Sequence, residues 1–134
     1  MQVDIAYLIG QWSFYIGMAA LASIIVHMIF LLIFHFLMPQ AVLDKYFKPP
    51  YFREMECMLF TGIPYAPIRT VMFMRVIAFP NSGKVRGIKE AHLLVPDWYR
   101  FVSKVMTVVA VANMLIVLLS MLGIGFAYLN QGPA

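Results

Sequence analysis

Three histidines are the side chains of this sequence best suited to metal or haem chemistry. His27 and His35 lie in an uncharged apolar stretch, and His92 lies in the more polar middle of the chain. On a helix, His27 and His35 would be about 80° apart, without the tight spacing of a two-ligand metal site. The second apolar stretch, residues 105–134, offers no facing histidine for a haem. We therefore expect no cofactor and no metal.

Other residue types suggest enzymatic chemistry even less. Residues 80–84 end in Ser-Gly-Lys but lack the first glycine and the final hydroxyl of a phosphate-binding loop. Glu54 and Glu56 are two residues apart, so on a helix they point in different directions and make no acid/base pair. Ser82 and Ser103 have no convincing His and Asp partners. We predict no catalytic residue and no enzyme, and leave open an active site shared with another subunit.

Two hydrophobic segments determine the architecture. Residues 5–38 and 105–134 contain no Asp, Glu, Lys or Arg. Each exceeds the ~20 apolar residues that cross a bilayer as a helix. The sequence predicts an all-α membrane protein, a hairpin of two transmembrane helices. The first helix is expected over residues 5–38, and the second over residues 96–129 with its span at 105–129. Residues 1–134 are expected to form a single membrane unit.

The distribution of charge predicts the orientation. All ten Lys and Arg residues lie between residues 45 and 104. Because cytoplasmic loops retain positive charge, the loop of residues 39–95 should be cytoplasmic and both termini outside. Attraction to anionic lipids explains the basic pI of about 9.4 more simply than nucleic-acid binding. We therefore expect membrane lipids as partners, and no nucleic acid.

The loop should contain amphipathic helices lying in the membrane interface. Residues 51–60 place apolar side chains on one helical face, and residues 68–79 are apolar but too few to span. We expect the apolar side chains to lie in lipid or against the spans: Phe52, Met55, Leu59 and Phe73. Basic side chains should contact lipid head groups: Arg69, Arg75, Lys84, Arg86 and Lys89.

Small and polar residues recur on one face of each predicted span. Such residues let membrane helices approach closely and form hydrogen bonds. The predicted packing positions are Gly10, Ser13, Gly17, Ala20 and His27 on the first helix, and Ala110, Asn113, Ser120 and Ala127 on the second. An unpaired polar group is costly in hydrocarbon. On the two predicted spans, His27 and Asn113 would lie at a similar depth in the membrane. We therefore predict a hydrogen bond between His27 and Asn113, whereas His35 should lie near the head groups.

Two parts of the loop carry a family resemblance. Pro64 is followed by Ile68-Arg69-x-Val71-x-Phe73-Met74, and Asp97-Trp98-Tyr99 leads into the last helix. Together they resemble universal stress protein B, a bacterial inner-membrane hairpin around a basic loop. The chain departs from that pattern by fewer charges before the second span and by the extra segment of residues 81–94. The resemblance implies location in the bacterial inner (plasma) membrane and a link to stress tolerance, with no catalytic residues to transfer.

Two functions remain open. The leading hypothesis is a non-enzymatic accessory or regulatory subunit of a larger membrane assembly, whose partners are other membrane protein subunits or copies of itself. The alternative is a small redox or transport-complex subunit in which His27 or Asn113 takes part within the membrane.

Overall fold

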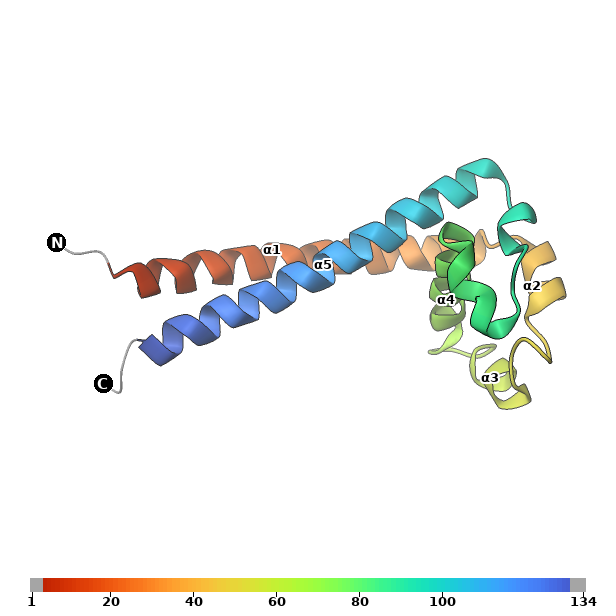
Figure 1. Cartoon of the computed structure of the whole chain (residues 1–134), viewed down its shortest axis with the longest axis horizontal. Helices are drawn as coiled ribbons and strands as arrows, with labels where there is room; N and C mark the ends of the chain where they lie inside the picture. The colour runs from red at the N-terminus through yellow and green to blue at the C-terminus, as the bar shows by residue number, and fades with distance from the viewer. Residues whose placement is uncertain (1–3, 131–134) are drawn as a thin grey trace. The chain divides into compact units, whose positions relative to one another are not determined.

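The computed structural model describes residues 4–130, and residues 1–3 and 131–134 lie outside this range. The described chain is helical and contains no strand, which confirms the all-α prediction (Figure 1). The elements in order are α1 (Ile5–Phe36), α2 (Gln40–Tyr46), α3 (Glu54–Leu59), α4 (Ala66–Ala78), the 3-10 helices η1 (Pro80–Arg86) and η2 (Ala91–Leu93), and α5 (Asp97–Asn130).

The helices α1 and α5 are both long and apolar enough to cross a membrane, as predicted. Pro39 follows the end of α1, where its ring and its missing N–H prevent the helix from continuing. Pro96 precedes α5, and Asp97 supplies a negative charge to its first turn. The end of α1 lies two residues before the predicted boundary at residue 38, and the start of α5 lies one residue after the predicted boundary at residue 96.

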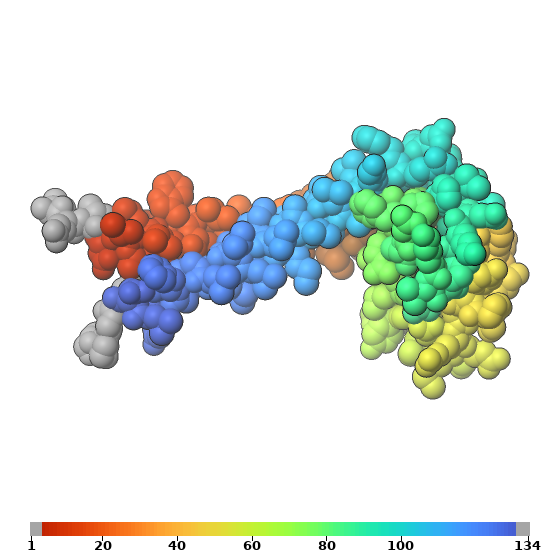
Figure 2. Space-filling model, viewed as in Figure 1, coloured from red at the N-terminus to blue at the C-terminus, as the bar shows by residue number. Residues whose placement is uncertain are grey.

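The contacts divide the chain into two compact units, and the expected single membrane unit over residues 1–134 stays a prediction. The first unit comprises the N-terminal part of α1, to His27, and the part of α5 from Val109 onward. These two segments lie side by side and run in opposite directions (Figure 2, red and blue). The second unit, residues 28–108, contains the loop and the flanking ends of both long helices.

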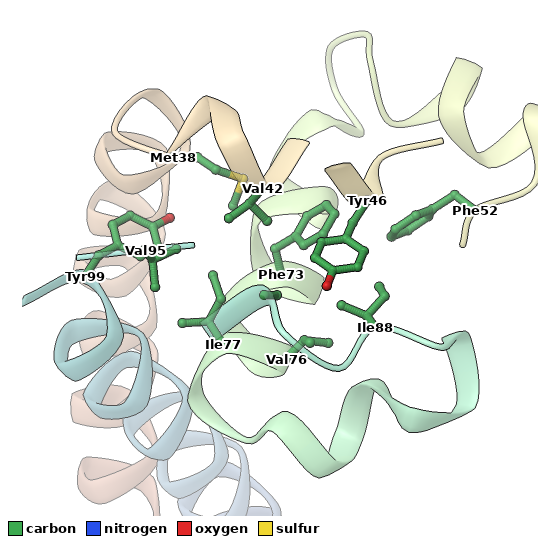
Figure 3. Packing of buried hydrophobic residues seen from close by; sticks show 11 residues of the cluster. Met38, Val42, Tyr46, Phe52, Phe73, Val76, Ile77, Ile88, Val95 and Tyr99 are labelled. Atoms are coloured by element: carbon green, nitrogen blue, oxygen red, sulfur yellow. The ribbon is translucent and has the colours of Figure 1, made fainter. Parts of the chain in front are cut away.

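The second unit has a hydrophobic core of its own (Figure 3). Phe73 of α4 is fully buried, and the centroid of its ring lies 5.5 Å from that of Phe52. The other members of this core come from α2, α4, η2, the start of α5 and the segments that connect them: Met38, Val42, Tyr46, Val76, Ile77, Ile88, Ala91, Val95 and Tyr99. The loop is therefore a folded module and not a series of separate surface helices.

This core corrects one prediction. Phe52 and Phe73 were expected in lipid or against the spans, but they pack against each other inside the loop module. A helical period identifies an apolar face, and the partner of that face depends on contacts between distant segments. Met55 and Leu59, in contrast, remain exposed on α3.

The segment after α4 is the 3-10 helix η1. It packs closely on α4, because a Cβ atom at buried Gly83 would lie 2.8 Å from Val76 Cγ1. Gly87 ends η1 with a left-handed backbone (φ 74°), a conformation that glycine adopts without steric cost. The amide of Ile88 then donates to the carbonyl of Gly83, which brings the Ile88 side chain into the core.

Candidate interfaces: the helix seam and the arginine cluster

Small residues bring the two helices of the first unit into close contact. A Cβ atom at Gly10 would lie 2.7 Å from Ala127 Cβ, and one at Gly17 would lie 3.2 Å from Ser120 Cβ. Real Cβ contacts are essentially never under 3.0 Å, so Gly10 admits no larger side chain without movement. The pairs match residues of rising number on α1 with residues of falling number on α5, as an antiparallel seam requires.

Gly123 also packs in this seam, but it was not among the predicted packing positions. A Cβ atom there would lie 2.9 Å from Ser13 Cβ. Between the predicted positions Ser120 and Ala127, a helical face with steps of three and four can pass through residue 123 or residue 124. Helical spacing alone does not decide between these two positions. The glycine at position 123 was the sequence feature that could have identified it as the packing residue. Ala110, another predicted packing position, is exposed.

Asn113 is a buried polar residue of the seam that bonds across it. Its Nδ2 donates a hydrogen bond of 3.1 Å to Ser23 Oγ, and the residue is 7% exposed. The predicted bond between Asn113 and His27 is therefore wrong, because the amide of Asn113 binds a different residue on α1. Ser23 and His27 are one helical turn apart. A depth calculated from the rise per residue is too coarse to distinguish two residues at this spacing. Ala20, Ser120 and Ala127 are buried as predicted positions of this seam.

In the loop module, Arg86 binds Glu56 through two hydrogen bonds. Its Nη1 and Nη2 atoms lie 3.0 and 2.9 Å from the carboxylate oxygens, and its guanidinium lies 4.8 Å from the centroid of the Phe52 ring. The Arg86 hydrogen bonds, with help from the Arg53 backbone amide, lower the pKa of Glu56 to about 2. The pair holds α3 to η1. The sequence analysis expected Arg86 to contact lipid head groups and did not predict its pairing with Glu56. Contact of Arg86 with lipid stays a prediction.

Arg69 and His35 occupy a second polar site in this module. His35 Nδ1 lies 2.7 Å from Thr70 Oγ1, and Thr70 is fully buried. The Arg69 guanidinium lies 4.9 Å from the centroid of the Phe47 ring, a cation–π contact. Burial lowers the pKa of Arg69, although an arginine remains charged in proteins. Both side chains thus have neighbours within the loop module.

The remaining predicted head-group residues, Arg75, Lys84 and Lys89, are exposed. Among residues 4–130, none of these three takes part in an ion pair. Their charges are therefore available to an external anion, and contact with lipid remains a prediction for each.

No family model matches this chain, and no curated protein or solved structure matches it either. The resemblance to universal stress protein B consequently remains a prediction based on the residues of the loop. Within residues 4–130, no group of three or more His, Cys, Asp or Glu side chains is placed to hold a metal ion.

Proposed function

We propose that this protein is a non-enzymatic membrane hairpin that serves as an accessory or regulatory subunit of a larger membrane assembly. The observation that carries the proposal is an apolar ridge on the loop module, formed by Met55, Met58, Leu59 and Ile63. These side chains are 73%, 79%, 49% and 96% exposed. Residues 55, 58 and 59 lie on one face of α3, because positions three and four apart are neighbours on a helix.

A protein partner fits the ridge better than an anionic lipid surface. Helices that bind such surfaces carry Lys and Arg on their polar face. In contrast, α3 carries Glu54 and Glu56 in its first turn, and no Lys or Arg occurs between Arg53 and Arg69. Methionines adapt to the shape of a partner, since their side chains are unbranched and polarizable. The ridge is therefore the proposed docking surface for another subunit.

The proposed orientation places residues 39–95 on the cytoplasmic side of a bacterial inner membrane. The positive-inside rule supports it, because the only charged residue outside residues 39–104 is Asp4. The resemblance to universal stress protein B supports the choice of membrane and a connection to stress tolerance. In this arrangement the ridge would meet the cytoplasmic part of the partner.

Photocrosslinking tests the ridge directly. A photoreactive amino acid replaces Met58 in one variant and Leu93 in a control, both exposed apolar positions of the loop module. In native membranes we expect Met58 to give one discrete adduct with a second membrane protein, and Leu93 to give none. The adduct is then identified by mass spectrometry. Lipid adducts alone at Met58, or the same protein adduct from both positions, would contradict the proposal.

The identified partner provides the second measurement. Met58→Asp should reduce its copurification in mild detergent about tenfold or more, because a charge would be desolvated at the interface. Leu93→Asp makes the same chemical change away from the ridge and should leave copurification unchanged. Equal losses in both variants would show that the ridge has no special role.

A further inference from the structure

The loop module contains a cavity of about 170 Å³ between Phe52, α4, η1 and the residues that follow η1. Its walls include the buried side chains of Phe52, Phe73, Val76 and Ile88, of which Phe73 and Val76 both lie on α4 (Figure 3). A dry apolar cavity of ~150 Å³ holds a molecule the size of benzene. This cavity can therefore accept an apolar group of about six carbon atoms.

Polar and positively charged groups also line this cavity. They are Arg75, Arg86 and Ser82. The Arg86 charge is balanced by Glu56, whereas Arg75 is exposed and forms no ion pair among residues 4–130. Lys84 is also exposed on η1 and adds a second unbalanced charge to this part of the surface. The local field is therefore positive and favours an anion.

We propose that this cavity binds an anionic amphiphile, with an apolar chain against the phenylalanines and a phosphate or carboxylate at Arg75. An inorganic anion alone would leave the buried apolar walls without contact. An uncharged apolar ligand would leave the charge of Arg75 without a partner. Both parts of the ligand contribute because apolar contact and charge pairing are separate sources of affinity. The inference concerns a small ligand and does not depend on a protein partner at the α3 ridge.

Hexyl phosphate is a suitable probe, since its chain has six carbons and its head is an anion. The full-length protein in phosphatidylcholine nanodiscs, with ¹³C-labelled methyl groups of Met72, Val76 and Ile88, reports binding by NMR. We expect saturable shifts with hexyl phosphate, much weaker binding of hexanol and no comparable shifts with inorganic phosphate. Equal effects of inorganic phosphate and hexyl phosphate at the same concentration would overturn the proposal.

Charge variants test whether the site is local. Arg75→Gln should weaken hexyl phosphate binding about fivefold, the loss typical of one partly exposed charge pair. Lys89→Gln is the matched control, because it removes the same charge from an exposed residue that does not line the cavity. Equal weakening in both variants would indicate non-specific attraction and overturn the site.

A volume variant tests the apolar half of the site. Met72 lines the cavity and is half-buried, so Met72→Trp should fill the space and abolish binding while the module stays folded. Binding of hexyl phosphate to a folded Met72→Trp protein with wild-type affinity would overturn the proposal. If this variant does not fold, the Arg75→Gln and Lys89→Gln comparison still decides the result.

The source of the amphiphile is distinguished by changing the lipid. In nanodiscs of phosphatidylglycerol, loss of hexyl phosphate binding would show that a bilayer lipid already occupies the cavity. Unchanged binding would indicate a free fatty acid or alkyl phosphate as the ligand. Both results assign the same anionic, amphiphilic chemistry to the site.

Discussion

Asn113 on α5 donates a hydrogen bond of 3.1 Å to the hydroxyl of Ser23 on α1. This bond links the two helices, and in a membrane it would pair two polar groups that hydrocarbon cannot satisfy. It also indicates that the buried amide serves helix packing. The redox or transport role considered for Asn113 stays a prediction.

The energy of this bond can be measured with a double-mutant cycle. Ser23→Ala and Asn113→Leu should each weaken hairpin packing, and the double variant should cost less than their sum by about 0.6 kcal/mol, the average for such bonds. The measurement is unfolding of the purified hairpin in mixed detergent micelles. His27→Leu combined with Asn113→Leu should be additive, and coupling there instead of at Ser23 would restore the original pairing.

Close packing at Gly123 should make it intolerant of a methyl group. Gly123→Ala would press on Ser13, and overpacking of this kind typically costs 1–3 kcal/mol. Gly125→Ala is the matched control, because no atom lies within 4 Å of a Cβ atom at that position. Unfolding in mixed micelles should therefore separate the two variants. Equal stability would mean that α1 and α5 do not approach closely at Ser13.

The core of the loop module should depend on Phe73. Removing this fully buried ring in Phe73→Ala should cost about 3–5 kcal/mol and make the loop sensitive to protease, as should the charge introduced by Phe73→Asp. Met58→Ala is the control at an exposed position and should change stability by less than about 0.5 kcal/mol. A digestion pattern unchanged by either Phe73 variant would argue against a folded module.

The pairing of Glu56 with Arg86 predicts a dependence on pH. The pKa of Glu56 is lowered from 4.5 to about 2 in the folded protein. A lowered folded-state pKa stabilises the module above the unfolded pKa, and this contribution is lost as pH falls from about 4.5 to about 2. Thermal unfolding across this range should show a smaller decrease for Glu56→Gln than for the wild type. Glu54→Gln, at an exposed neighbouring carboxylate, should behave like the wild type.

Orientation can be tested by labelling cysteines with an impermeant maleimide in intact cells. Cys57→Ser provides the background, and Val85 and Asn130 provide exposed positions in the loop and near the end of α5. Gly83 is unsuitable, because a side chain there would collide with Val76. We expect labelling of Asn130→Cys and protection of Val85→Cys until the membrane is permeabilised. The reverse pattern would place the loop outside.

Local sequence was sufficient for the long helices and for most of their seam. The absence of charge over residues 5–38 and 105–134 leaves a spanning helix as the stable structure in lipid, and Pro39 and Pro96 limit the two helices. Helical geometry likewise places Gly10, Gly17 and Ser120 on regular faces. These features depend on residues within a few turns of one another, so a single sequence contains the required information.

Long-range contacts determined the rest. The choice of Ser23 over His27 for Asn113 depends on the register of two helices, which a shift of one turn would alter. The burial of Phe73 depends on Phe52 and Ile88, which reach it only after the loop folds. The pairing of Glu56 with Arg86 likewise joins residues 30 positions apart. Such pairings depend on tertiary packing, because periodicity shows which face is apolar or charged but not what that face meets.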